Sequence, residues 1–190
     1  MLVVNAPVRE AVDTLNRCVL QEMPIIIVNH ADEKVIGHGR DLTLFDIDYC
    51  EENNIVLLNA NFSGGACVVF EDDVNIICYH EGFSDIGQRT LELVNSYLQD
   101  KGLNSSIIGN DLIITEDEIL YKVGSFASVW INNDRGMETV IHFALNIDNE
   151  LIERICKKPI NKIPKSLSDY GITSQELLDF LWSNLEDLKG

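Results

Sequence analysis

The sequence predicts an α+β fold, with a central mixed, largely antiparallel sheet packed by helices. Apolar helical stripes occur near both ends of the chain and once in its middle. Strand-like runs cluster between these helices instead of alternating with them one by one, which argues against regular βαβ units. A length of 190 residues with 46% hydrophobic residues suits one domain with its own core, so we expect a single domain over 1–190.

The first half of the chain is expected to hold one helix and several short strands. Residues 7–22 carry an apolar helical stripe, and Pro7 suits the first helical turn. Pro24 ends this helix. Apolar runs then predict strands at 25–28, 34–37, 54–60, 67–70 and 74–80. Because only a short acidic turn at 71–73 separates the last two strands, we expect them to pair as an antiparallel hairpin.

The second half repeats the order of helix, strands and helix. A helix is expected at about 85–100, where Asp85 and Gln88 have the spacing of a capping box. A closing helix begins at about 174, with Thr173 and Glu176 as its capping box. Strands are predicted between these helices at 111–115, 119–131 and 139–147. We therefore expect a sheet of about six strands.

The charge distribution excludes one class of partner and indicates another. With 14 basic and 31 acidic residues, the formal net charge is −17, which repels nucleic-acid backbones. One stretch, 154–165, is basic and contains no acidic residue. It is either a solvated loop or a docking patch for an acidic partner. Its basic residues are Arg154, Lys157, Lys158, Lys162 and Lys165.

The cysteines and the hydropathy pattern predict a location inside the cell. Five scattered cysteines form no C-x-x-C pair, which suits a reducing compartment such as the cytoplasm and gives no metal-binding spacing. No apolar run reaches the length of a membrane span. Pro7 and Arg9 interrupt the first apolar residues, so we expect neither export nor a membrane anchor.

Two short segments contain residue types that bind anions. In Ser63-Gly64-Gly65-Ala66, the paired glycines would let backbone N–H groups approach a phosphate or carboxylate, although such a pair is also common in plain turns. Gly109-Asn110-Asp111-Leu112 precedes a strand that carries Lys122. A strand lysine is usually solvated, but one that points into a cavity can hold a carboxylate or phosphate oxygen.

Taken in order, these segments resemble the lipoate–protein ligase family. The run LLNANFSGGACVVFEDDVNI resembles its Arg-Arg-x-Ser-Gly-Gly-Gly-Ala-Val-Tyr-His-Asp-x-Gly-Asn signature. GNDLII and YKVGSFAS resemble its Gly-Arg-Asn-Asp-Leu and Lys-hydrophobic-Ser-Gly-Ser-Ala motifs, VIHFALNID its His-His-Gly-x-Leu-Leu-x-Asn strand, and VIGHGRD its Ile-Gly-Arg-Asn-Gln turn. The resemblance covers about residues 8 to 185 and implies a biotin/lipoate ligase-like catalytic domain. The C-terminal accessory domain of many relatives is expected to be absent.

The resemblance implies acyl activation followed by acyl transfer. In the family, ATP with Mg²⁺ and lipoate (or octanoate) gives an acyl-adenylate, and the acyl group passes to a lysine of an acceptor domain. Lys122 corresponds to the catalytic lysine, expected to face one cavity with the glycine loop. The implied partners are a lipoyl-acceptor domain protein, docked on the basic stretch, and a separate small accessory subunit. The implied substrate- and nucleotide-binding residues are Ser63, Gly64, Gly65, Asp72, Asn75, Asn110, Asp111 and His142.

The sequence also departs from the family motifs, and this keeps two alternatives open. Ala60-Asn61 stands in place of the arginine pair, Gly124 directly follows Val123, and Phe143 replaces a glycine. One alternative is an ATP-independent octanoyl or lipoyl transferase, with Cys156 as nucleophile and Lys157 and Lys158 lowering its thiol pKa. The other is a non-catalytic relative that binds an acyl ligand or a protein partner.

Overall fold

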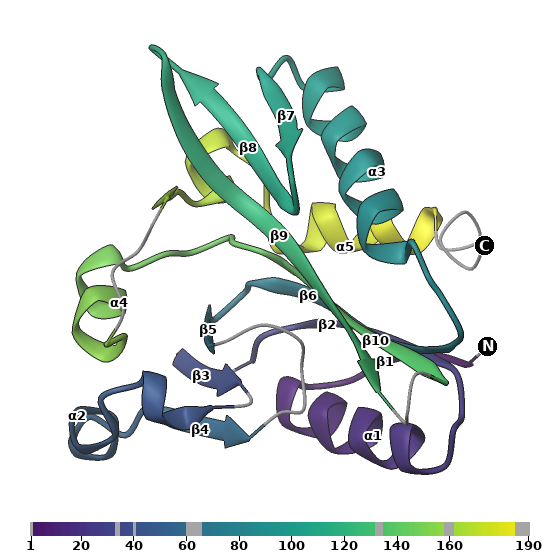
Figure 1. Cartoon of the computed structure of the whole chain (residues 1–190). Coiled ribbons are helices and arrows are strands. Elements are labelled where there is room, and N and C mark those ends of the chain that lie inside the picture. Colours follow the sequence, from purple (N-terminus) through teal and green to yellow (C-terminus); the bar gives the residue numbers. More distant parts are fainter. Residues whose placement is uncertain are drawn as a thin grey trace.

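The computed structural model describes residues 2–32, 35–39, 41–59, 66–131, 135–157 and 162–184 (Figure 1). The helices are α1 (Val8–Leu20), α2 (Ile47–Glu52), α3 (Ile86–Asp100), α4 (Asn149–Ile155) and α5 (Ser174–Ser183), with 3₁₀ turns at Leu42–Leu44 and Leu167–Tyr170. The strands are β1 (Leu2–Asn5), β2 (Ile25–His30), β3 (Val35–Gly39), β4 (Val56–Asn59), β5 (Ala66–Phe70), β6 (Val74–Glu81), β7 (Ser105–Ile108), β8 (Asp111–Glu116), β9 (Ile119–Ile131), β10 (Gly136–Phe143) and β11 (Ile163–Pro164).

A large mixed sheet forms the centre of the molecule. Its eight described strands have the order β1-β2-β6-β10-β9-β8-β7, with β11 paired to β9. Only the pairings of β1 with β2 and of β11 with β9 are parallel. The predicted fold class, a central mixed and largely antiparallel sheet packed by helices, is therefore confirmed. The sheet has more strands than the expected six because the short strands β1, β7 and β11 lacked a clear sequence pattern.

Helices cover both faces of the large sheet, as the alternation of residues along β2 requires. Ile26 and Val28 join the core beneath α3 and α5. Ile25 and Ile27 point the other way and pack against α1. Figure 1 shows α3 and α5 on one side of this sheet and α1 on the other. Each fully buried aliphatic side chain contributes about 1.5–3 kcal/mol, so this two-sided burial is a main source of stability.

A second, three-stranded sheet lies on the α1 side. Its order is β4-β3-β5, with β3 parallel to β4 and antiparallel to β5. Val68 and Phe70 of β5 pack in a cluster with residues of α2 and α4. Cys67 and Val69, on the opposite face of β5, belong to the cluster that includes Ala31, just after β2. Cys67 therefore points inward, away from the layer of α2 and α4.

The predicted hairpin of β5 and β6 is wrong. β5 belongs to the small sheet, whereas β6 pairs with β2 and β10 in the large one. Between the two strands, Asp72 N donates to Ala31 O and Ala31 N donates to Asp73 O, each at 2.9 Å. The polar turn thus bonds to the end of β2 instead of closing a hairpin, and it leads the chain from one sheet to the other.

The two predicted capping boxes had different outcomes. At α5, Thr173 Oγ1 accepts from Glu176 N at 3.2 Å, which confirms the predicted N-cap. At α3, the Asp85 side chain makes no capping hydrogen bond and pairs instead with Arg89 at 2.8 Å.

Among the helices in the described ranges, none combines the length and hydrophobicity needed to cross a bilayer.

Candidate functional site

Lys122 lies at an irregularity in the central sheet. Leu112 of β8 is opposite Gly124, but the next residue, Ile113, is opposite Lys122, so Val123 is an extra residue in β9. Such a bulge redirects side chains relative to the regular strand. Val123 is buried in the core beneath α3 and α5. Lys122 therefore points to the opposite face, the one that carries α1 and the small sheet.

Two of the departures from the family motifs compensate for each other beside this bulge. Gly124 and Phe143 are direct partners across β9 and β10. A Cβ atom on Gly124 would lie 2.7 Å from Phe143 Cδ1, which is closer than side-chain atoms pack. The large side chain on one strand thus requires the glycine on the other.

Asp111 holds Lys122 in place from the adjacent strand. Lys122 Nζ lies 2.8 Å from Asp111 Oδ1, and the two side chains are 35% and 16% exposed. Burial alone would raise the pKa of the Asp111 carboxyl group. The hydrogen bonds and charges of Lys122 and Lys162 outweigh burial, and the pKa is lower than its usual value. The carboxylate is therefore ionised at neutral pH. Asn110 directly precedes it, with an exposed side chain and a backbone carbonyl that accepts from Phe126 N at 3.0 Å.

The second oxygen of Asp111 pairs with a lysine from a distant part of the sequence. Lys162 Nζ contacts Asp111 Oδ2. Lys162 reaches this position because β11 pairs with β9, with Pro164 opposite Lys122. A backbone hydrogen bond from Lys165 N to Lys122 O, 3.0 Å long, continues the pairing. The structure thus brings together Lys122, Asp111 and one member of the basic stretch, which the sequence had indicated separately.

A second polar group lies on the same face of the large sheet and centres on a buried carboxylate. Asp73 is fully buried and accepts hydrogen bonds from three backbone N–H groups: Phe70 at 2.9 Å, Leu145 at 2.6 Å and Asn146 at 3.2 Å. His142 Nε2 lies 3.0 Å from Asp73 Oδ2. Asp73 thus joins the turn after β5 to the end of β10.

The sequence-predicted residues near Asp73 lie in different environments. His142 is opposite Asn75 of β6 and Ser125 of β9, three positions from Lys122. Asn75 is buried, and its Nδ2 donates to Asn29 Oδ1 at 3.2 Å. Asp72 is exposed, at a turn position with φ of 74°, and accepts from Asn146 Nδ2 at 3.4 Å. The structure therefore groups His142 and Asn75 and leaves Asp72 on the outside. Sequence reasoning missed Asp73, although an aspartate just before a strand is a common turn signal.

The thiol of Cys67, on the small sheet, is influenced by the charge of Lys122 on the large sheet. Burial and the charge of Asp73 raise the pKa of this thiol and the charge of Lys122 opposes the rise, giving a net pKa of about 12. Lys122 is therefore within electrostatic range of β5 across the two sheets. The predicted loop residues Ser63, Gly64 and Gly65 directly precede β5 in the sequence but fall outside the described residues. So do Ala60 and Asn61, and the expected shared cavity stays a prediction.

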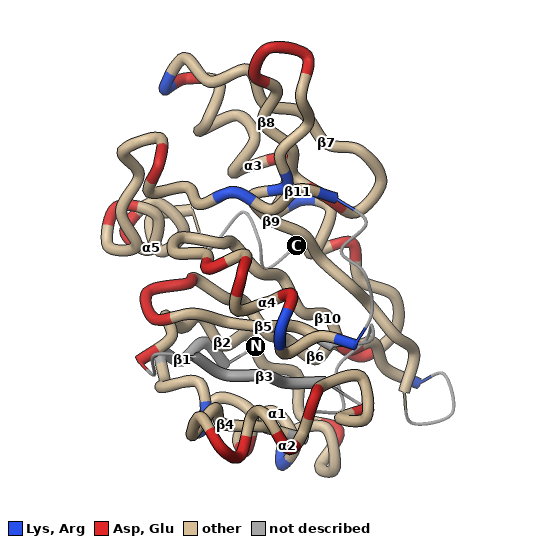
Figure 2. The backbone as a smooth tube through the Cα atoms, turned by 90° about the vertical axis from the view of Figure 1, so that its left-hand side faces the viewer, with Lys and Arg blue, Asp and Glu red and all other residues tan. Residues whose placement is uncertain are grey.

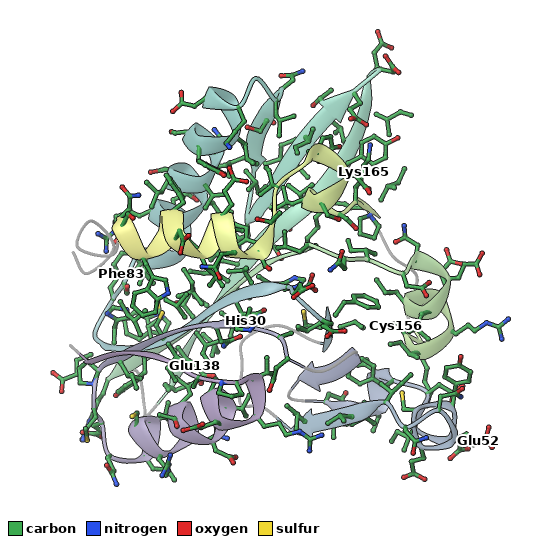
Figure 3. All side chains as sticks on the ribbon, turned by 180° about the vertical axis from the view of Figure 1, so that it is seen from behind. His30, Glu52, Phe83, Glu138, Cys156 and Lys165 are labelled. Atoms are coloured by element: carbon green, nitrogen blue, oxygen red, sulfur yellow. The ribbon has the colours of Figure 1, made fainter. Side chains whose placement is uncertain are left out.

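The expected lowering of the Cys156 thiol pKa is not supported by its described surroundings. Burial raises the pKa of its thiol, and Cys50 raises it further. The flanking Lys157 side chain is exposed, and Lys158 lies outside the described residues. Cys156 forms the C-cap of α4 and an isolated bridge with Phe45. Figure 3 shows Cys156 well separated from Lys165, which marks the β11 side of the molecule.

The basic stretch divides into two parts on one side of the molecule (Figure 2). Arg154 and Lys157 are exposed at the end of α4. Lys162 and Lys165 lie along β9, in ion pairs with Asp111 and Glu116. The part at the end of α4 thus lies apart from the carboxylates of β8 that pair with the second part.

Among the described residues, no group of three or more His, Cys, Asp or Glu side chains could hold a metal ion.

Comparisons with known proteins agree on the fold. No protein-family model matches the sequence, and no curated protein matches it. A bipartite lipoate protein ligase from Thermoplasma acidophilum, solved in a study that includes its E2 lipoyl domain, aligns with a TM-score of 0.75 and 18% identity, over 98% of this chain and 82% of that chain. P. falciparum LipL1 in complex with lipoate gives 0.76 and 12%, over 98% and 62%. Lipoate-protein ligase A bound with ATP gives 0.74 and 16%, over 98% and 84%. The chain therefore has the fold of the lipoate–protein ligases along nearly its whole length.

Proposed function

We propose that this protein is a lipoate–protein ligase that attaches lipoyl or octanoyl groups to a lysine of an acceptor domain through an acyl-adenylate. The observation that carries this proposal is the ion pair of Lys122 with Asp111, on the sheet face that carries the small sheet. By the motif resemblance, Lys122 corresponds to the family's catalytic lysine, and the fold aligns over 98% of this chain with the bipartite ligase.

The known structures support the substrates of this proposal. One similar protein is in complex with lipoate and another is bound with ATP. An acidic chain needs local cations to bind the carboxylate of an acyl substrate and the phosphates of a nucleotide, because its net charge of −17 repels both. Lys122 and Lys162 are cations of this kind. They fit an α-phosphate, whereas Asp111 already gives one oxygen to each lysine and is therefore not placed to hold Mg²⁺ as well.

The chemistry assigned to Lys122 is electrostatic. ATP supplies the leaving group that activates the acyl carboxylate. Negative charge then develops first on the α-phosphate and later on the carbonyl oxygen attacked by the acceptor amine. An ammonium group held ready at this point stabilises both transition states without reorganising. Asp111 orients Lys122 through their ion pair. We assign the supporting binding contacts to Ser63, Gly64, Gly65, Asn75, Asn110 and His142, with Asp72 at the exposed rim.

For the partner, we propose docking of an acidic lipoyl-acceptor domain on Arg154, Lys157 and Lys158. Arg154 and Lys157 are exposed at the end of α4, and α4 lies on the same side of the molecule as β11 (Figure 2). A bipartite ligase studied with its E2 lipoyl domain is among the similar structures. A separate accessory subunit for this chain remains part of the proposal. All five cysteines are free, which fits the proposed cytoplasmic or other reducing compartment.

Mass spectrometry of the products separates the three functions. The protein is incubated with lipoate or octanoate, ATP, Mg²⁺ and a lipoyl-acceptor domain, and both proteins are then weighed. Acceptor acylation that requires ATP supports the ligase. Acylation without ATP from an acyl carrier protein, with an acyl-thioester on this chain, indicates the transferase. If the protein binds the acyl ligand but never transfers it, the ligase proposal is wrong and the protein is a binding relative.

A further inference from the structure

Asp111 pairs with two lysines at once, and this leaves the group with a net positive charge. Lys122 contacts Oδ1 and Lys162 contacts Oδ2. Two ammonium groups and one carboxylate sum to +1, within a chain whose formal charge is −17. All three side chains retain some exposure, 35% for Lys122, 44% for Lys162 and 16% for Asp111. One arriving carboxylate or phosphate oxygen would therefore neutralise this group without having to displace Asp111.

Four contacts of Lys165 hold Lys162 at this position. Lys165 N bonds to Lys122 O, which fixes the backbone of β11 against β9. The Lys165 ammonium group pairs with Glu116 of β8. It also lies 4.5 Å from the ring centroid of Tyr121 and 4.8 Å from that of Tyr170, within cation–π range. These contacts fix the backbone of the segment that carries Lys162, three residues earlier in the chain.

We propose that Lys162 binds the anionic group of the substrate together with Lys122, while Asp111 positions both ammonium groups. This inference rests on the proposed function and deepens it, because it assigns Lys162 to substrate binding and removes it from the docking patch. The anion is either the carboxylate of the acyl substrate or the phosphate of the nucleotide, since both present oxygens that a lysine can contact. Lys165 acts only through β11 and is a positioning residue.

Binding of charged and uncharged ligand pairs tests the proposal. Lipoate is compared with lipoamide, which lacks the carboxylate charge, and AMP is compared with adenosine, which lacks the phosphate. Dissociation constants are measured by calorimetry for the parent chain, Lys162→Gln and Lys162→Arg. In Lys162→Gln, loss of a charge-assisted hydrogen bond should weaken binding of the relevant anion by roughly tenfold. The uncharged ligand of the same pair should bind as before, and Lys162→Arg should retain most of the affinity.

A matched control comes from Lys101, which has the same exposed fraction as Lys162 and pairs with a carboxylate elsewhere in the structure. Lys101 contacts Glu176, its side chain is also 44% exposed, and its ammonium group lies 5.3 Å from the ring centroid of Tyr97. Lys101→Gln removes the same charge and should change no affinity. Lys165→Met should reproduce part of the Lys162→Gln defect if β11 must be anchored.

Each outcome decides between the inference and the proposed function. If Lys162→Gln loses affinity for lipoate alone, the carboxylate is the anion that Lys162 binds. If it loses affinity for AMP alone, the anion is the phosphate. If Lys162→Gln binds both anions like the parent while Lys122→Gln loses them, the inference is wrong and the ligase function stands. If the parent binds none of the four ligands, the proposed function fails and the inference fails with it.

Discussion

Lys122 Nζ and Asp111 Oδ1 lie 2.8 Å apart across two adjacent strands of the central sheet. The bulge at Val123 makes this contact possible, because it turns Lys122 to the face opposite the main core. The same carboxylate also pairs with Lys162 from β11. The ion pair is therefore the point where three separate segments of the chain meet, and the first prediction concerns it.

Removing the Lys122 ammonium group should abolish most of the acyl-transfer activity and change the stability of the fold only slightly. Loss of one donor directed at a developing oxyanion lowers a rate by roughly a hundredfold or more. Lys122→Ala should therefore transfer acyl groups at about one hundredth of the parental rate, and Lys122→Arg should recover only part of it because the guanidinium group differs in shape. Acyl transfer to an acceptor domain is measured together with thermal unfolding. Parental rates in both folded variants would show that Lys122 is not catalytic.

Asp111 should contribute to stability above its own pKa and not below it. Its folded-state pKa is lower than the usual value of about 3.9 for an aspartate. A group with a depressed pKa stabilises the fold at higher pH, and this stabilisation disappears as the pH falls through the folded-state pKa. The stability difference between the parent and Asp111→Asn should therefore be largest near neutral pH and shrink below about pH 4. Urea unfolding at pH 7 and pH 3 measures both differences, and a constant difference would contradict the assignment.

Much of the fold, and only part of the site, could be predicted from the sequence. Helices such as α5 were predictable because apolar periodicity and the capping residue Thr173 are local signals. Lys122 and Asp111 were found through local motifs. The contact of Lys162 with Asp111 was not predictable, because β11 is only two residues long and its pairing joins distant segments. Asp73 was missed for a related reason, since two of its three backbone donors come from Leu145 and Asn146, far along the chain.

Asp73 should matter for stability far more than its neighbour Asp72. Asp73 is fully buried, accepts hydrogen bonds from three backbone N–H groups and contacts His142. Each buried donor left without a partner costs about 1–3 kcal/mol. Asp73→Ala should therefore lower the free energy of unfolding by about 3 kcal/mol or more. Asp72→Asn, on the exposed turn, keeps a residue type that tolerates the positive φ there and should change the free energy of unfolding by about 0.5 kcal/mol or less. Urea titrations give both values, and similar losses would rule out a special role for Asp73.

The proposed docking patch predicts a salt-sensitive interaction with the acceptor domain. Lys157→Glu reverses an exposed charge at the end of α4 and should weaken acceptor association by several-fold, mainly through slower association. Raising the ionic strength from about 0.05 to 0.5 M should reduce the difference from the parent, because salt screens exposed charges. Arg17→Glu makes the same type of change on α1 and serves as the control. Equal binding by Lys157→Glu and the parent at low salt would remove Lys157 from the interface.

Cys67 and Cys156 are both partly exposed thiols with raised pKa values. Burial raises the pKa of both, to about 12 for Cys67, so neither thiol forms an appreciable thiolate at neutral pH. Since the thiolate is the nucleophile, both should react with iodoacetamide at pH 7.5 much more slowly than a free cysteine does. Cys67→Ser and Cys156→Ser should likewise transfer acyl groups at close to the parental rate. Peptide mass spectrometry after timed alkylation measures the first effect, and the acceptor assay measures the second. Rapid alkylation of Cys156, together with loss of transfer in Cys156→Ser, would overturn the ligase mechanism and favour transfer through a thioester.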